Sequence, residues 1–361
     1  MTRRIPCVLM RGGTSRGPFL LASDLPADPA RRDAVLMRIM GSPDPLQLDG
    51  LGGGKSLTSK VAIVSRSGEP GADVDYLFAQ VKVHEARVDT KPNCGNMLSG
   101  VGPFAIEAGL VAARDPETVV RIFNVNTRTR VDGIVRTPGG IVEYDGDTRI
   151  DGVPEPASPI KLTFLDAMGA MTGKLLPTGR VVDVIGGVEA SCVDMAMPVV
   201  IMEAAAFGKQ GVETPEELEA DRELFARLAE IRIEAGRLMG LGDVTHAVVP
   251  KPVLVCRARN GGSLTSRYFT PLRCHRSHAA TGALAVATAA VLPGSIASRH
   301  ATCAGVAAGA LVVEHPAGCI RVDLEMTERE GMPEVRRASL VRTARRIFEG
   351  HVLVPESLFT S

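Results

Sequence analysis

Two apolar segments rich in small residues constrain the fold of this 361-residue chain more than any other feature. The first follows a polar turn at residues 92–96, and the second follows a polar turn at residues 274–278. Apolar residues recur at roughly helical spacing in the first, whereas Ala dominates the second. Helices of this kind must be buried, so we expect each to run through its own half of the chain with strands around it.

Short strands are predicted on both sides of each segment. Apolar and alternating runs are separated by turn residues, such as Asp-Gly at 132–133 and Gly-Gly at 139–140. The strands expected in the first half lie at residues 5–10, 18–21, 60–65, 74–84, 119–126, 133–136, 141–144 and 160–164. Those expected in the second half lie at 181–185, 198–202, 253–257, 266–269, 311–313, 320–324 and 351–354.

Three further helices are predicted from their patterns and end signals. A short helix is expected at residues 29–40. The clearest helix is expected at 214–239, because Thr214 and Glu217 form a capping-box pattern and Pro215 suits the first helical position. A basic helix is expected at residues 339–348.

The order of strands and apolar helix is similar in the two halves, although the letters are not. We therefore expect an α+β fold of two similar domains, each a curled, mostly antiparallel sheet around a central helix. The first domain would span residues 1–180, with residues 345–361 as a candidate to complete it, and residues 166–179 would form a linker. The second would span residues 181–344, with its central helix at 278–292.

Composition excludes several classes of partner. Lys and Arg number 41, as do Asp and Glu, so no global field favours nucleic acid or a membrane surface. Seven scattered Cys without paired spacing, together with the absence of a leader or an 18-residue apolar run, predict a reduced, cytoplasmic protein. The sequence leaves the oligomeric state open, a homodimer or higher homo-oligomer included.

Cys94 is the first candidate for chemistry, because it stands on the turn that opens the first apolar helix. Asn93 can cap this helix. A thiol in the first turn meets the positive end of the helix dipole, which favours the thiolate, and the free N–H groups there can hold a carboxylate. The alternative is a buried structural cysteine beside a tight turn.

A second candidate is the turn that follows the first strand, R-G-G-T-S-R-G. Its two glycines allow tight backbone geometry, and Arg11, Thr14, Ser15 and Arg16 crowd hydrogen-bond donors into six residues. This pattern is typical of a site that binds a carboxylate or phosphate, and the alternative is a solvated polar hairpin.

The glycine-rich stretch at residues 49–59 ends like a phosphate-binding loop, but Asp49 stands where that motif needs its first glycine and no strand leads into it. Nucleotide binding is therefore not expected. We expect a loop that enters the strand beginning at Lys60, with Ser56, Thr58 and Ser59 beside the lysine. On these residues alone, the favoured interpretation of Lys60 is an ordinary exposed strand-end lysine.

In the second half, Cys274, His275 and His278 are too few to complete a zinc site, so no metal is expected. The histidines would instead bond ligand or backbone, His275 being the better candidate. Two helix N-termini with Arg11, Arg16 and Arg276 as counter-charges could hold a small polycarboxylate. A base beside such a ligand suits proton abstraction next to a carbonyl.

Five motifs in order resemble the 2-methylaconitate cis–trans isomerase family, most closely its 4-oxalomesaconate tautomerase and Δ-isomerase branch in aromatic-acid degradation. They are C-V-L-M-R-G-G-T-S-R-G, L-T-S-K-V-A-I-V, N-C-G-N-M-L-S-G-V-G-P-F-A-I-E-A-G-L-V, Y-D-G-D-T-R-I-D-G-V-P and L-L-P-T-G. The resemblance covers nearly the whole chain. It implies the diaminopimelate epimerase fold, with the site between two similar domains.

The resemblance also implies roles for particular residues. The family's catalytic lysine falls on Lys60 and its cysteine on Cys94. Epimerases of this fold use a second cysteine, which this chain lacks at its second helix, H-A-A-T-G, so a lysine-based isomerase is expected. The substrate-binding residues expected around it are Thr14, Ser15, Arg16, Ser56, Ser59, Gly95, Asn96, Met97, His275, Arg276, Ser277, Thr281 and Gly282.

The expected activity is a cofactor-independent shift of one proton on an unsaturated keto tricarboxylate. Lys60, as an uncharged amine, would remove a methylene proton that the neighbouring carbonyl already acidifies, so no cofactor is needed. Lys60 or Cys94 would return the proton to oxygen or to the far allylic carbon. The alternatives are a 2-methylaconitate cis–trans isomerase and a non-catalytic accessory protein of an Fe–S dehydratase.

Overall fold

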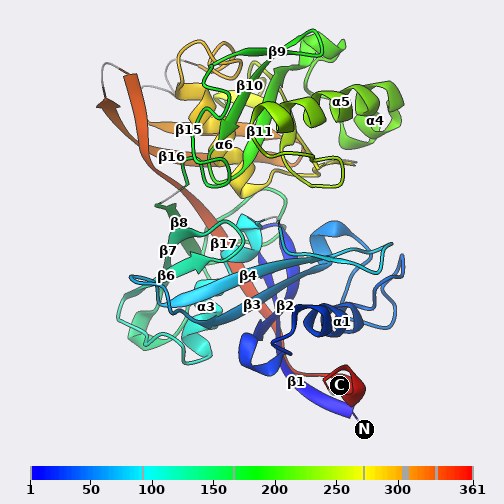
Figure 1. Cartoon of the computed structure of the whole chain (residues 1–361). Helices are drawn as coiled ribbons and strands as arrows, with labels where there is room; N and C mark the ends of the chain where they lie inside the picture. The colour runs from blue at the N-terminus through cyan, green and yellow to red at the C-terminus, as the bar shows by residue number, and fades with distance from the viewer. Residues whose placement is uncertain are drawn as a thin grey trace. The chain divides into compact units, whose positions relative to one another are not determined.

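The computed structural model of the chain describes residues 2–91, 93–165, 167–270, 273–302, 309–329 and 332–359, without the side chains of 328–329 and 332–334 (Figure 1). Cys303 lies outside these ranges. The chain divides into two compact units. Unit 1 comprises Met1–Leu162 and Arg342–Ser361, and unit 2 comprises Thr163–Val341, which includes the stretch expected as a linker.

Six strands of unit 1 pair in chain order, in the sequence antiparallel, parallel, antiparallel, parallel, antiparallel. The short strand β5 (Val88–Asp89) extends one end of β4, and β17 (Met332–Pro355) runs antiparallel to β1 along its length. The strands in order are β1 (Thr2–Gly12), β2 (Ser15–Leu21), β3 (Lys60–Arg66), β4 (Val74–Val81), β6 (Glu117–Asn124) and β7 (Thr129–Arg136), and β8 (Pro159–Phe164) pairs with β17.

Unit 2 repeats this pairing pattern. Its strands also pair in chain order as antiparallel, parallel, antiparallel, parallel, antiparallel. The order of antiparallel and parallel pairings is therefore the same in the two units. The strands are β10 (Val188–Asp194), β11 (Pro198–Glu203), β12 (Lys251–Cys256), β13 (Leu264–Thr270), β15 (Ala310–His315) and β16 (Gly318–Arg329), with β9 (Asp183–Ile185) on β10 and β14 (Arg273–Cys274) on β13.

One face of the unit 1 sheet is covered by α1 (Pro29–Met40), which lies between β2 and β3 in the chain (Figure 1). Val61 and Ile63 of β3 share a buried cluster with the apolar side of this helix. Because side chains alternate along a strand, Lys60 faces the opposite side. That side contacts α2 (Gly95–Leu98), which is followed by α3 (Val101–Glu107).

In unit 2, α4 (Pro215–Ala220) and α5 (Arg222–Leu238) take the place of α1 in chain order. The second apolar segment forms α6 (Ala280–Val291), and every one of its residues is buried. It contacts β10, β11, β15 and β16. Its many Ala residues let these strands approach the helix closely, and it lies within residues 278–292, where a helix was expected.

Four expectations about secondary structure are corrected. Residues 339–348 are not a helix but part of β17, because their backbone pairs with β16 and β1. The helix expected at 214–239 is two helices, since the Asp221 side chain caps α5 by accepting from Leu224 N. Residues 141–144 form no strand after the 3-10 turn η3 (Pro138–Gly140), and β10 was not expected.

Within the described ranges, no helix is long and apolar enough to cross a membrane.

Candidate active site

The first turn of α2 begins at Cys94, which is the N-cap residue in extended backbone geometry. The expectation that Asn93 caps the helix is wrong, because the helix starts one residue later and no side chain caps its N-terminus. The Cys94 side chain is buried, and its carbonyl accepts a hydrogen bond from Tyr76 Oη at 3.2 Å. Burial, and then the proximity of Cys94, raise the pKa of Tyr76 well above its ordinary value.

Three polar side chains near this turn are buried and have atoms without a partner. They are Ser15 (Oγ), Asn93 (Oδ1 and Nδ2) and Asn96 (Oδ1), with exposed fractions of 2%, 8% and 3%. An unsatisfied buried polar group costs about 1–3 kcal/mol, and such groups in a native protein mark a place where a polar ligand can bind. Ser15 Oγ and Asn93 Nδ2 can donate to carboxylate or carbonyl oxygens, whereas Asn93 Oδ1 and Asn96 Oδ1 can accept only from a hydroxyl, an N–H or a protonated carboxyl group.

The turn between β1 and β2 is held against α2. Asn96 Nδ2 donates to Thr14 Oγ1 at 3.0 Å, and a Cβ on Gly13 would lie 2.2 Å from Asn96 Oδ1. Arg11 Nη1 donates to the carbonyls of Gly13 and Thr343, both at 3.0 Å. Burial, and then Arg345, lower the pKa of Arg11 to about 10. Through these hydrogen bonds the Arg11 guanidinium stabilises the turn, so we assign it a structural role and not a ligand-binding one.

Lys60 is the first residue of β3 and is buried, with an exposed fraction of 9%. Its Nζ donates to Gln80 Oε1 at 2.9 Å and lies 4.9 Å from the centre of the Phe78 ring. Within the described residues, Lys60 pairs with no carboxylate. The alternative of an exposed strand-end lysine is wrong for this structure, because the amine lies against an aromatic ring and a neutral amide.

Lys60 and the turn at Cys94 both contact the same face of β4. Tyr76, Phe78 and Gln80 alternate along this strand and therefore share a face. Tyr76 bonds the Cys94 carbonyl, whereas Phe78 and Gln80 contact the Lys60 amine. The two residues that carry the expected chemistry thus both contact this face.

Gly17 packs closely against both the start of β3 and the first turn of α2. A Cβ on Gly17 would lie 1.7 Å from the Lys60 carbonyl oxygen and 3.3 Å from Met97 Cε. The start of β3 and the first turn of α2 therefore flank one glycine, and only a residue without a side chain fits between them.

The loop before Lys60 contains the 3-10 turn η2 (Ser56–Thr58). Ser59 is fully buried, and its hydroxyl donates to the Val81 carbonyl and accepts from Gln47 Nε2, so its side chain is bonded within the protein. Ser56 is exposed. Arg16 reaches the same loop, since its Nη2 lies 3.0 Å from a Cβ placed on Gly53, and its Nε is buried without a partner.

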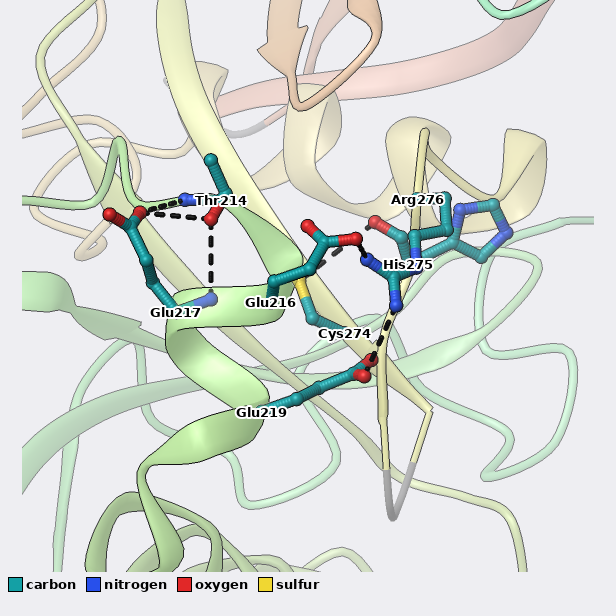
Figure 2. A network of polar contacts seen from close by, with 7 residues as sticks. All are labelled: Thr214, Glu216, Glu217, Glu219, Cys274, His275 and Arg276. Atoms are coloured by element: carbon teal, nitrogen blue, oxygen red, sulfur yellow. Dashed lines mark hydrogen bonds and ion pairs between the residues drawn. The ribbon is translucent and has the colours of Figure 1, made fainter.

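The predicted residues of unit 2 lie around β14 and the start of α6. Arg276 forms ion pairs with Glu216 and, at 3.2 Å, with Glu219, both on α4 (Figure 2). Its guanidinium would have to leave these carboxylates in order to bind a substrate. Ser277 N donates to His275 Nδ1 at 3.1 Å.

The N-terminus of α6 has no side-chain cap, and Thr281 in its first turn is buried. A Cβ on Gly282 would lie 2.2 Å from the Tyr268 ring, so the helix approaches this ring closely. His278 bonds Ser266 Oγ and the Ala279 carbonyl. Among the residues that the structure describes, no three His, Cys, Asp or Glu side chains form a group that could hold a metal.

Sequence reasoning missed Gln80, Phe78 and Tyr76. The signal was present in the alternation of the predicted strand, which places all three on the face opposite Leu77 and Ala79. The repeat also places a second buried lysine, Lys251, at the first position of β12, equivalent to Lys60 in β3.

This fold is that of a known class of isomerase. The solved structure of a methylitaconate-delta-isomerase matches with a TM-score of 0.82 at 38% identity, covering 100% of this chain and 98% of that one. The chain belongs to the PrpF protein family, whose model matches residues 2–355. The isomerase family predicted from five motifs is therefore confirmed.

Three relatives match over their full or nearly full length. YbhH of Escherichia coli (strain K12), provisionally named an isomerase, is 55% identical over 98% of this chain and 100% of its own. The 4-oxalomesaconate tautomerase of Pseudomonas putida is 51% identical, over 97% and 96%. The (4E)-oxalomesaconate Delta-isomerase of Novosphingobium sp. (strain KA1) is 50% identical, over 97% of each. The chain is an isomerase.

Proposed function

We propose that this chain is a cofactor-independent isomerase that moves one proton on 4-oxalomesaconate during the degradation of aromatic compounds. The observation that carries the proposal is the Lys60 amine, buried on the face of β4 that also contacts the Cys94 turn. The identities of 51% and 50% to two enzymes named for oxalomesaconate support the substrate. We propose the diaminopimelate epimerase-like arrangement for both units, supported in unit 2 by the contacts of α6.

The proposed reaction begins with substrate binding. N–H groups at Gly95 and Asn96 and the side chains of Ser15 and Arg16 bind carboxylate oxygens, which gives the buried Ser15 Oγ and Arg16 Nε a partner. Met97 and Thr14 hold the two elements that carry these groups. Binding places the acidic methylene next to Lys60.

The Lys60 lone pair then takes the methylene proton, and the C–H electrons pass into the carbonyl to give a dienolate and an ammonium ion. N–H groups and Arg16 stabilise the oxyanion. The proton returns to oxygen in a tautomerisation, or to the far allylic carbon in a 1,3-shift of the double bond. The reaction is balanced without any other reactant.

Cys94 has two candidate roles, proton donor to the far carbon and residue that orients the substrate. Cys94→Ser separates them, because serine retains the shape but is a far weaker acid than a thiol. A large loss of kcat with little change in KM assigns proton transfer. A near-normal kcat assigns orientation.

The test follows deuterium from D₂O into oxalomesaconate and 2-methylaconitate side by side, using purified protein and NMR. We expect incorporation at the carbons of the allylic system of oxalomesaconate. Faster exchange and cis–trans conversion of 2-methylaconitate would replace the proposed substrate. No exchange on either compound would favour an accessory role.

His275, Arg276, Ser277, Thr281 and Gly282 stay predicted substrate-binding residues. Thr281→Val tests the prediction, since it removes one hydroxyl at nearly constant volume. A raised KM with kcat retained would support binding at α6, and unchanged kinetics would exclude Thr281.

A further inference from the structure

We propose that Gln80 is a positioning residue for the Lys60 base, holding the amine at one site in the active centre through a neutral hydrogen bond. This inference rests on the proposed function, in which Lys60 removes the proton. It adds a residue that none of the sequence motifs indicated.

The orientation of the Gln80 amide is fixed by its own partners. Its Nε2 donates to the Ser59 carbonyl at 2.8 Å and to the Ser56 carbonyl at 3.2 Å. A flipped amide would set Oε1 against these two carbonyl oxygens, so Oε1 must point the other way. In that direction it meets Lys60 Nζ at 2.9 Å.

The backbone reinforces this geometry. Lys60 and Gln80 are directly opposed in the antiparallel register of β3 and β4, and their side chains leave the sheet on the same face. Phe78, two residues earlier on that face, lies beneath the amine. The amine is therefore held from the side by Gln80 and from below by an aromatic ring.

A neutral amide suits a base better than a carboxylate would. A carboxylate beside Lys60 would stabilise the ammonium form and so keep the amine protonated. An amide oxygen accepts one N–H without adding charge, which leaves the lone pair of the free amine available to the substrate. Gln80 also connects the base to the loop at residues 56–59, so movement of that loop would misplace the amine.

Two substitutions test the proposal. Gln80→Glu keeps the shape but adds a charge, so the acidic limb of the kcat/KM pH profile should move up by about 1–3 pH units. Gln80→Met removes the hydrogen bond without a charge, so kcat should fall by roughly 10–100-fold while KM changes by less than about threefold. If both variants keep the wild-type kcat and pH profile, the proposal is overturned.

Gln47→Met is the matched control, because Gln47 supports the same loop through Ser59 Oγ and Gly54 N without touching Lys60. It should leave the pH limb in place even if it lowers stability. An equal shift of the limb in Gln47→Met would assign the effect to the loop and overturn a role for Gln80.

A second readout does not depend on the substrate. The acetylation rate of Lys60 by acetic anhydride is measured against pH by mass spectrometry, with the exposed Lys55 as internal reference. The pH of half-maximal rate should rise by about 1–3 units in Gln80→Glu. An identical pH profile of Lys60 acetylation in wild type and Gln80→Glu would refute the positioning role. A wild type that turns over neither oxalomesaconate nor 2-methylaconitate would refute the proposed function alone.

Discussion

Gly17→Ala is predicted to damage both the stability of unit 1 and catalysis. The added Cβ would lie 1.7 Å from the Lys60 carbonyl oxygen, whereas ordinary contact begins at 3.4 Å. The obstacle is backbone, so the start of β3 must retreat by roughly 1.5–2 Å. Overpacking of this kind costs about 1–3 kcal/mol, and we expect the upper end of the range because a strand must move.

The catalytic effect follows from the same displacement. Misplacing a catalytic group by about 1 Å costs on the order of 100-fold in rate, so kcat should fall at least that far. A loss of 3 kcal/mol would lower the melting temperature by roughly 6–12 °C for a unit of this size. The assays are thermal unfolding and steady-state turnover of oxalomesaconate.

Gly68→Ala is the matched control, because its Cβ would meet nothing within 4 Å and its φ is not left-handed. It should unfold within about 1–2 °C of wild type, or slightly higher. If Gly17→Ala kept the wild-type melting temperature and kcat, the close approach between β2 and Lys60 would be wrong.

Two further predictions concern unit 2 and the buried thiols. Asp221→Ala should cost about 1 kcal/mol through loss of the α5 cap, and Asp221→Asn less. The Leu224 N–H and then Lys209 lower the pKa of Asp221 in the folded protein. The carboxylate therefore contributes to stability above its unfolded pKa of 3.8, and this contribution is lost as the pH falls below that value. Urea titrations of wild type and Asp221→Ala should converge below that pH, and a constant difference would argue against the cap. Burial raises the pKa of Cys7, Cys192 and Cys274 to about 12, so roughly one molecule in 10⁴ is a thiolate at pH 8. Iodoacetamide should label these three only in urea, as judged by mass spectrometry, and labelling of the folded protein would contradict their burial.

Sequence signals such as helix caps predicted the secondary structure correctly where long-range strand pairing did not override them. The bounds of α1 were predicted correctly, because Asp28 caps it, Pro29 begins it and Gly41 ends it in left-handed geometry. Residues 339–348 carry a helix-like basic pattern, but pairing with β1 and β16 decides their structure. No local signal reports such partners, so this error could not be avoided from the residues alone.

The candidate site was predicted only in part for a similar reason. The resemblance to the isomerase family indicated Lys60. Cys94 was indicated by the same resemblance and by its place on the turn that opens the first apolar helix. Gln80 carries a neutral amide and lies in a strand with an ordinary alternating pattern, so its own residue type gives no signal. Its role depends on the register of β3 and β4, which places it directly opposite Lys60. Asn93 was expected to cap a helix, and only the position of the helix start shows that its side chain is unpartnered.

The central claim is that the Lys60 amine moves the proton, and isotope exchange tests it most directly. Wild type and Lys60→Met are incubated with oxalomesaconate in D₂O, and NMR follows deuterium at the allylic carbons. The account predicts steady incorporation by wild type and exchange at the uncatalysed rate by Lys60→Met, with both proteins folded by circular dichroism. Wild-type exchange in Lys60→Met would show that another group removes the proton.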